Sequence, residues 1–299
     1  MLLAPFLALV GALFFALNNL SARRAVIRVK DTSAGVAVSV LISLPVLFLA
    51  LMISGTVGDV LRFPWHGYLW LLGAGLIQQY LGRSLGFRAV KLVGANIFSV
   101  LTRITPLVAV SLGVVVLGEV VTGKMLLGIL LIVAGVLFVG GNPLQSRQSK
   151  TSSANMSPKG ILLGVGAGVC YGLTPLMIKM ALNSYSSPIA ALFISFCGAS
   201  IIHALLNVKG DKRKLLLTID NRTFWLFSVS GLLVVLAQIS RFFALSMAPI
   251  SIISPLFAVN PLLVIPLSFV FNRKLEVFSK WVIVSAVIVV AGSLLLLWD

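Results

Sequence analysis

Residues Asn96–Gly140 read NIFSVLTRITPLVAVSLGVVVLGEVVTGKMLLGILLIVAGVLFVG, and this stretch decides how the rest of the chain is organised. Its first half is an apolar run of helical length that carries one charge, Arg103, and then a proline, Pro106. A short polar break around Glu119 leads into a second apolar run. An α-helix needs ~20 apolar residues to cross a hydrocarbon core of ~30 Å. The stretch therefore predicts two membrane-spanning helices joined by a short polar connection.

The same pattern returns near the C-terminus, from SIISPLFAVNPLLVIPLSFVF to WVIVSAVIVVAGSLLLLW. Aligning the two copies on Pro106 and Pro261 also pairs Ser99 with Ser254 and, upstream of the quoted stretches, Ala89 with Ala244. After a two-residue insertion, Glu119 pairs with Glu276. Between the copies lies a polar segment, NPLQSRQSKTSSANMSPK, which is typical of a flexible linker. We therefore interpret residues 1–141 and 160–299 as two repeats, separated by a linker at 142–159.

The composition excludes an ordinary soluble domain. The 299 residues are 59% hydrophobic and only 10% charged, whereas about a quarter of the residues in globular proteins are charged. The net charge of +16 does not indicate nucleic-acid binding, because most of the charges lie between apolar runs, where lysine and arginine set membrane orientation. The two cysteines lie inside apolar runs, and nothing in the sequence indicates a metal site or a cofactor.

Membrane-spanning runs can be placed ten times along the chain. The predicted spans are residues 2–20, 34–53, 68–87, 96–117, 125–139, 160–182, 188–206, 224–247, 250–271 and 281–298. Each repeat then has an odd number of spans, so the two repeats enter the bilayer from opposite faces. The predicted fold is an all-α membrane protein of ten transmembrane helices, arranged as two inverted five-helix repeats around a central cavity.

Basic residues are distributed unevenly between the two sides of the predicted membrane. Odd-numbered connections and the adjacent span ends hold 18 lysines and arginines, whereas the even side holds four: Arg62, Lys124, Lys179 and Arg241. The positive-inside rule then places the linker in the cytoplasm and both termini outside an inner or plasma membrane.

The ordered motifs resemble the drug/metabolite transporter superfamily, and specifically its ten-helix EamA-type proteins. The resemblance rests on Thr105-Pro106, Gly118-Glu119 and Ala134-Gly135 in the first copy, and on Asn260-Pro261 and Ala291-Gly292 in the second. It implies alternating-access transport of a metabolite through a central cavity. It also implies peripheral fifth and tenth helices that often serve dimer contacts, so a homodimer is a possible partner. Such proteins commonly keep both termini in the cytoplasm, in contrast to the charge count.

Arg103 is the first candidate for substrate binding. A guanidinium within a span costs roughly 2.5–3.5 kcal/mol on insertion scales, so it should face a cavity or a partner. Its planar donors suit a carboxylate or a phosphate, although snorkelling or internal pairing would also explain it. The other predicted cavity residues are polar groups within spans, namely Asn18, Asn19, Gln79, Tyr80, Ser99, Tyr171, Thr174, Gln238 and Asn260, and the predicted hinges are Pro106 and Pro261.

None of the seven acidic residues lies inside a predicted span. This argues against proton-coupled efflux of cations and favours a neutral, zwitterionic or anionic substrate. Without an intramembrane acid, a metal-ligand cluster or a paired nucleophile, catalysis is not predicted. The sequence therefore predicts a secondary transporter for a small polar metabolite, an amino acid or a related carboxylate-bearing compound. The alternative is a membrane scaffold, or an accessory subunit of a lipid-processing complex, which does not transport.

Overall fold

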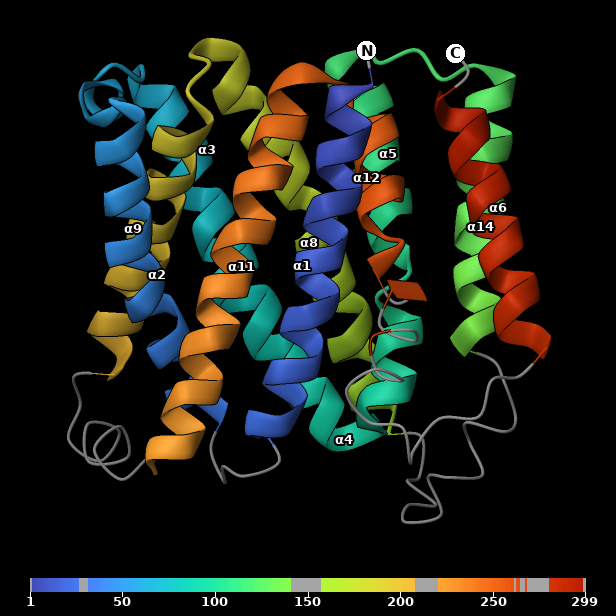
Figure 1. The fold of residues 1–299 in the computed structure, drawn as a ribbon, viewed down its shortest axis with the longest axis horizontal. Coiled ribbons are helices and arrows are strands. Elements are labelled where there is room, and N and C mark those ends of the chain that lie inside the picture. The colour runs from blue at the N-terminus through green and yellow to red at the C-terminus, as the bar shows by residue number, and fades with distance from the viewer. Residues whose placement is uncertain are drawn as a thin grey trace.

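A computed structural model of the chain describes residues 2–26, 32–140, 157–207, 220–260, 262–263, 267 and 280–297, and their regular secondary structure is helical throughout. The elements are α1 (Leu3–Val26), α2 (Thr32–Ser54), a 3₁₀ turn η1 (Val57–Leu61), α3 (Trp65–Gly75), a π-helical turn η2 (Leu76–Gly82), α4 (Arg83–Leu101), α5 (Ile104–Leu117), α6 (Gly123–Gly140), α8 (Pro158–Ser184), α9 (Pro188–Asn207), α11 (Asn221–Met247), α12 (Ile250–Phe257) and α14 (Lys280–Leu297). The predicted all-helical class is confirmed for this part of the chain (Figure 1).

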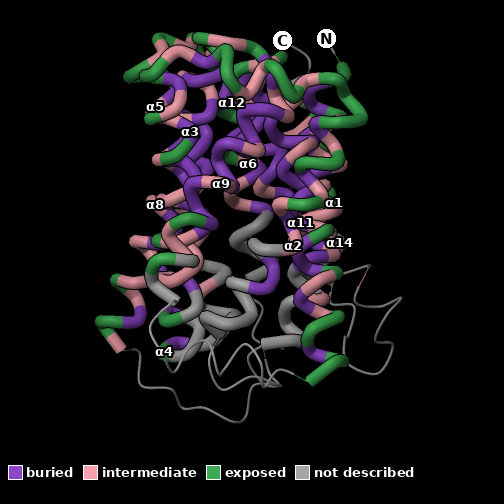
Figure 2. Tube along the Cα trace, turned by 90° about the vertical axis from the view of Figure 1, so that its left-hand side faces the viewer, coloured by how far each residue is buried: buried purple, intermediate pink, exposed green. Residues whose placement is uncertain are grey.

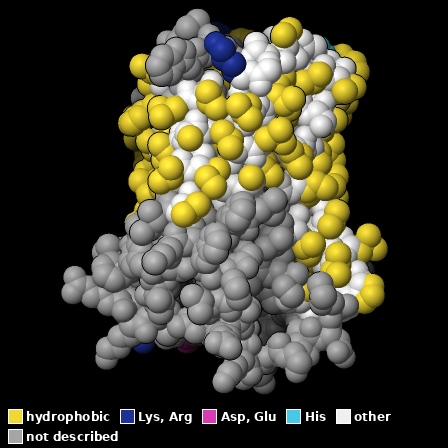
Figure 3. Space-filling model, turned by 90° about the vertical axis from the view of Figure 1, so that its right-hand side faces the viewer, with side chains coloured by type: hydrophobic (Ala, Val, Ile, Leu, Met, Phe, Trp, Pro, Cys, Tyr) yellow, Lys and Arg dark blue, Asp and Glu magenta, His cyan; other side chains and the backbone are white. Residues whose placement is uncertain are grey.

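The outer surface of the helical bundle is apolar. Helices α8 and α11 have 27 residues each and are long and apolar enough to cross a membrane, by length and composition. Large hydrophobic side chains point outward, for example Val115 on α5 at 81% exposure and Val287 on α14 at 64%. Where Figure 3 shows described residues, hydrophobic and uncharged groups cover the side of the molecule. Such a surface suits hydrocarbon rather than water.

The core forms mainly between the first half (α1–α6) and the second half (α8–α14). Helix α1 packs on α11 and α12, α2 packs on α9 and α11, and α3, α4 and α5 pack on α8. Helix α3 also packs on α9, α5 packs on α12, and α6 packs on α14 at one edge of the bundle (Figure 1). Buried backbone runs through the interior of the bundle (Figure 2). Neither half therefore has an extensive core of its own.

These contacts come in matched pairs. If α1, α2, α3 and α6 correspond to α8, α9, α11 and α14, the contact between α1 and α11 corresponds to that between α8 and α3. The contact of α2 with α11 corresponds likewise to that of α9 with α3, and the contact of α2 with α9 corresponds to itself. The packing therefore has the pairwise symmetry expected of a repeated unit.

Corresponding helices of the two halves run in opposite directions. Gly11 and Ser21 of α1 meet Ala237 and Leu226 of α11 respectively, so α1 and α11 are antiparallel. Helix α8 runs parallel to α5, because Gly164, Gly168 and Gly172 meet Leu101, Ile104 and Val108 in order. The carboxylate of Glu119, just after α5, bonds the backbone just after α11, so α5 and α11 also run in the same direction. Helix α1 is consequently opposed to its counterpart α8.

Two glycines mark equivalent close approaches in the two halves. A β-carbon on Gly75 of α3 would lie 1.9 Å from the carbonyl oxygen of Ser195 on α9. A β-carbon on Gly231 of α11 would lie 2.7 Å from the carbonyl oxygen of Ser39 on α2. Each glycine therefore allows a backbone contact that a side chain would prevent. Gly164 and Gly168 of α8 allow similar close approaches to Leu101 and Ile104.

The connection predicted between the third and fourth spans, at residues 88–95, has helical backbone. Helix α4 continues through it to Leu101, and the helix breaks at Thr102–Arg103. Pro106 explains this position, because its ring clashes with the carbonyl group of residue 102 and it has no N–H to donate there. The Thr105 amide bonds the carbonyl oxygen of Thr102 at 3.1 Å, as in a tighter turn. The chain nevertheless reverses along α8 within this stretch, because Tyr171 meets Gly82, Gly160 meets Leu92 and Val93, and Gly164 meets Leu101.

Candidate functional site

Arg103 lies at the break between α4 and α5. It occupies the N-cap position of α5, and its side chain makes no capping hydrogen bond. Helix α8 packs closely here, because Gly168 lies against Thr102 and Ile104, and the Thr105 hydroxyl donates to the carbonyl oxygen of Gly168 at 3.0 Å. The second half of the chain thus supports the position of this break.

The guanidinium of Arg103 is partly without a partner. Its Nε atom is inaccessible to solvent and has no hydrogen bond within the part of the chain that the structure describes. Unsatisfied buried donors are rare in native proteins and call for an explanation such as a ligand or a bound water. The start of α5 adds the partial positive charge of a helix N-terminus. The arrangement is suited to an anion.

The second half contains a break at the corresponding position. Helix α12 ends at Phe257, and Ala258 and Val259 form a turn. On α12, the hydroxyl groups of Ser251 and Ser254 are buried without hydrogen-bond partners among the described residues. Ser254 is the repeat counterpart of Ser99. Discontinuous helices near the middle of the membrane are a feature of substrate sites in secondary transporters.

Helix α11 contributes two large polar side chains that are buried, Gln238 and Arg241. Gln238 is 1% exposed, and neither its amide oxygen nor its amide nitrogen has a partner in the described structure. Arg241, one turn further along, is 7% exposed. The sequence reasoning predicted Gln238 but counted Arg241 as a charge of the even side. The signal was available, since Arg241 lies inside the span predicted for residues 224–247.

The π-helical turn η2 holds a second polar cluster. Arg83 donates from Nη1 to the side-chain oxygen of Gln79 at 3.3 Å and to the Ser39 hydroxyl at 3.4 Å. The ring of His203 on α9 lies 3.4 Å from the Gln79 carbonyl oxygen and 5.5 Å, between ring centroids, from Tyr80. Arg83 was counted as a connection charge in the sequence reasoning, whereas it lies inside the helical bundle. The structure therefore places Gln79 beside Arg83, and Tyr80 beside His203.

The register of the two halves explains the π-helical turn. Gly231 follows its counterpart Gly75 by 156 positions, whereas Ala244 follows Ala89 by 155. The first half thus has one extra residue between these points, where η2 lies, and α11 is α-helical throughout the equivalent stretch. Single insertions of this kind are accommodated as π-bulges, often at functional sites. The insertion makes the two halves unequal at this cluster.

Of the remaining predicted site residues, some bond within the bundle, some only pack or are partly exposed, and some lie outside the described residues. Asn18 is buried and accepts a hydrogen bond from the Ser230 hydroxyl of α11, whereas the Thr174 hydroxyl bonds a carbonyl oxygen of its own helix. Tyr171 lies against Gly82 and Gly86, and Asn260 is partly exposed. The side chains of Asn19 and Ser99, and all of Pro261, lie outside the described residues.

Two charged side chains secure the connection between α11 and α12. The Glu119 carboxylate accepts from the amides of Ile250 and Ser251 at 2.7 and 2.9 Å, at the start of α12. Lys179 of α8 donates to the carbonyl oxygens of Leu245 and Ala248 at 2.7 and 3.0 Å, at the end of α11. Each charge complements the dipole of the helix end that it contacts. Glu119 therefore stabilises a helix start, on a helix of the other half.

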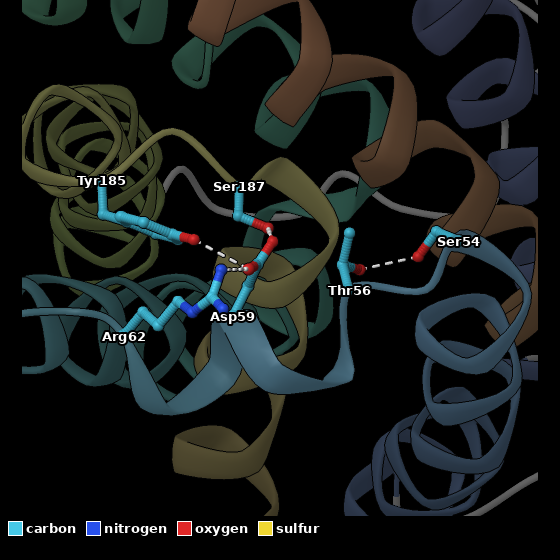
Figure 4. Close-up of polar contacts among 6 residues, drawn as sticks. All are labelled: Ser54, Thr56, Asp59, Arg62, Tyr185 and Ser187. Carbon is cyan, nitrogen blue, oxygen red and sulfur yellow. Dashed lines mark hydrogen bonds and ion pairs between the residues drawn. The ribbon is translucent and has the colours of Figure 1, made fainter.

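At the end of the bundle where α11 is joined to α12, a polar contact outside the spans also joins the two halves (Figure 4). Asp59 of η1 accepts from the Tyr185 hydroxyl at 2.7 Å and from the Ser187 hydroxyl at 2.9 Å, both between α8 and α9. Arg62 lies 3.3 Å from the same carboxylate. The hydrogen bonds from Tyr185 and Ser187 hold the pKa of Asp59 below its usual value. The ionised form of Asp59 is therefore the one that the fold stabilises.

Asp59→Asn is expected to lower the melting temperature of the purified protein at pH 7. Because the pKa of Asp59 is lower in the folded state, the contribution of Asp59 to stability is complete above about pH 4 and is lost as the pH falls through the folded-state value. Melting curves of the wild-type and Asp59→Asn proteins should consequently converge below about pH 4. Tyr185→Phe, which removes one donor, serves as the matched variant. Parallel curves across this range would contradict the assignment.

Among the described residues, no group of three or more His, Cys, Asp or Glu side chains could hold a metal ion. The functional geometry of this part of the chain consists of cations, amides and hydroxyl groups.

Comparison with known proteins places this geometry in a family. The profile of the EamA-like transporter family matches residues 2–141 and 158–298. A solved structure, titled only as the crystal structure of a protein, has a TM-score of 0.76 and 18% sequence identity, with coverage of 98% of this chain and 94% of that chain. At this identity it shows the fold alone. Curated proteins gave no match. The chain therefore belongs to the EamA-like transporter family, as the sequence resemblance implied.

Proposed function

We propose that this transporter of the EamA family is a secondary transporter that moves a small carboxylate-bearing metabolite, such as an amino acid, by alternating access. Its ten spans would form two inverted five-helix repeats, at 1–141 and 160–299, around a central cavity. The matched helix contacts and the opposed directions of α1 and α8 support this arrangement. In inverted repeats the substrate site lies near the bilayer midplane, between the two halves.

The single observation that carries the substrate class is the partnerless Nε atom of Arg103 at the start of α5. A guanidinium in a span costs roughly 2.5–3.5 kcal/mol on insertion scales. A substrate carboxylate would recover much of this cost by accepting two parallel N–H donors. The three acidic residues that the structure describes, Asp59, Glu119 and Asp220, lie at helix ends. None of them is placed to take up and release protons within a described span.

The helix breaks supply a route to alternating access. Pro106 leaves the segment at Thr102–Arg103 without a regular α-helical hydrogen bond, so α4 and α5 can change their relative angle there. Pro261 would act in the same way in the second half. Arg103 lies on this hinge, so a bound carboxylate would bias the angle between the two half-helices. Substrate binding and the change of access would then be coupled.

Two further features of the proposal concern the whole molecule. The basic excess stays on the odd side even if Arg83 and Arg241, which lie within the helices, are left out of the charge count. This excess favours both termini outside. Homodimerisation would use α6 and α14, whose outer faces expose Leu127 and Leu130 and also Val287 and Val290. Lipid would cover the same faces in a monomer.

Thermal stabilisation of the purified protein by matched ligands tests the substrate class. A ligand that binds the folded state raises the melting temperature with its concentration. L-leucine would be compared with 3-methylbutylamine, and L-glutamine with 4-aminobutanamide, because each pair differs by one carboxylate. Stabilisation by the carboxylate member alone is expected for at least one pair in a wider amino-acid panel. Stabilisation only by amines would overturn the carboxylate assignment.

A further inference from the structure

Arg241 is a deeply buried cation that no described acid neutralises. It is 7% exposed and lies six residues before the end of α11 at Met247. No hydrogen bond or ion pair reaches its side chain within the described structure, and the guanidinium lies over the ring of Phe257, with its carbon 5.1 Å from the ring centroid. A guanidinium has five N–H donors, and a ring face satisfies none of them as a carboxylate would. The Arg241 guanidinium is therefore buried without an acidic partner among the described residues.

Gln238 lies on the same face of α11, three residues before Arg241. Both polar atoms of its amide are buried and without partners, although nearly all buried polar atoms in native proteins have one. Gly11 of α1 allows close packing at this point, because a β-carbon there would lie 2.6 Å from Phe257 and 3.1 Å from the Ala237 carbonyl oxygen. Phe15 completes the wall, with its ring centroid 5.4 Å from that of Phe257. The pair is thus enclosed by α1, α11 and α12.

A purely structural role would explain only part of this arrangement. Arg241 lies over the last residue of α12, where a cation complements the helix dipole. The carbonyl oxygens of Ser254, Pro255 and Leu256 at this end accept from the Ala258 amide rather than from Arg241. The dipole also gives no reason for the unsatisfied amide of Gln238. Two adjacent polar groups without partners indicate a shared ligand.

Arg241 and Arg103 lie at different depths. Helices α5 and α11 end at the same side of the bundle, as the bond between Glu119 and Ile250 shows. Arg103 precedes the 14 residues of α5, so it lies about 21 Å below that end, whereas Arg241 lies about 9 Å below it. The backbones of the two arginines therefore differ in depth by about 12 Å.

We propose that Arg241 and Gln238 form a second carboxylate-binding subsite, walled by Phe15 and Phe257 and supplied by the second half of the chain. Its role in transport rests on the proposed function. Each half then provides one arginine that binds the substrate carboxylate, Arg103 from the first half and Arg241 from the second, at different depths. The carboxylate moves from one arginine to the other as access changes. Arg241 has Gly86 as its repeat counterpart, so the path is asymmetric even though the fold is repeated.

The test measures binding and stability of the full-length protein together, with Arg241→Gln, Arg241→Lys, Arg103→Ala and the exposed α11 control Arg222→Gln. The probes are the L-amino acids of the thermal panel. Arg241→Gln should weaken carboxylate binding about tenfold or more, and Arg241→Lys should weaken it less. The melting temperature of the ligand-free Arg241→Gln protein should stay equal or rise, because an uncompensated buried charge is removed.

Labelling by phenylglyoxal, mapped by mass spectrometry, gives an independent readout. Arg241 should react in ligand-free protein and be protected by the stabilising amino acid. A lower ligand-free melting temperature for Arg241→Gln with unchanged affinity would assign Arg241 a structural role and overturn the subsite. If Arg103→Ala loses binding while Arg241→Gln keeps it, the subsite is wrong and the proposed function stands. If no carboxylate binds the wild-type protein, both proposals are overturned.

Discussion

Gly75→Ala is expected to prevent the chain from folding stably. The added β-carbon would lie 1.9 Å from the carbonyl oxygen of Ser195, a contact that neither backbone can relieve without separating α3 from α9. Overpacking of a close-packed interior typically costs about 1–3 kcal/mol, and more where backbone must move. We expect more than about 3 kcal/mol here. The measurement is the yield of monodisperse protein and its melting temperature in detergent.

The symmetry of the fold provides the controls. Gly231→Ala places a β-carbon 2.7 Å from the Ser39 carbonyl oxygen and should also destabilise, but less. Gly166→Ala on α8 meets only Leu85, at 3.6 Å, and should be neutral or slightly stabilising, since alanine favours a helix. Equal stability of the Gly75→Ala and Gly166→Ala proteins would contradict the packing of α3 on α9.

Arg103→Ala is expected to abolish detectable carboxylate binding. Removing one partner of a buried charge pair typically costs about 2–5 kcal/mol, which weakens affinity by about 30-fold or more. Arg103→Lys keeps the charge but loses the planar donors, so it should retain part of the affinity. The ligand-induced rise in melting temperature measures the effect. The exposed residue Arg88 of α4 supplies the control variant Arg88→Ala, which should bind as the wild type does.

Unchanged affinity in Arg103→Ala would remove Arg103 from the site. A fall in the melting temperature of the ligand-free variant would indicate instead that Arg103 supports the break between α4 and α5. The two readouts therefore separate binding from structure.

The family and the helical class could be predicted because their signals are local. Long apolar runs specify helices whatever surrounds them, and Thr105-Pro106 and Gly118-Glu119 are read directly along the chain. The break between α4 and α5 is local too, because the backbone chemistry of Pro106 decides where the helix stops. The polar residues at 88–95 correctly marked the stretch where the chain turns back along α8. The sequence did not reveal that the backbone stays helical through this turn.

Arg83 and Arg241 could not be placed by counting charges along the sequence. Whether a basic residue near a span end enters water or the bundle depends on helices that are distant in sequence. Arg83 bonds Ser39 of α2, and Arg241 lies over Phe257 of α12. The role of Glu119 on α12 is equally non-local, since 131 positions separate it from Ile250. Arg103 was found because it stands well inside an apolar run, where any charge is conspicuous.

Counterflow in proteoliposomes tests the central claim most directly. Vesicles containing the purified protein would be loaded with the amino acid that stabilises it and diluted into a trace of the same compound in labelled form. A secondary transporter working by alternating access should transiently accumulate the label without any ion gradient, and Arg103→Ala should not. Binding without accumulation in the wild-type protein would contradict transport and would favour a membrane scaffold or accessory subunit.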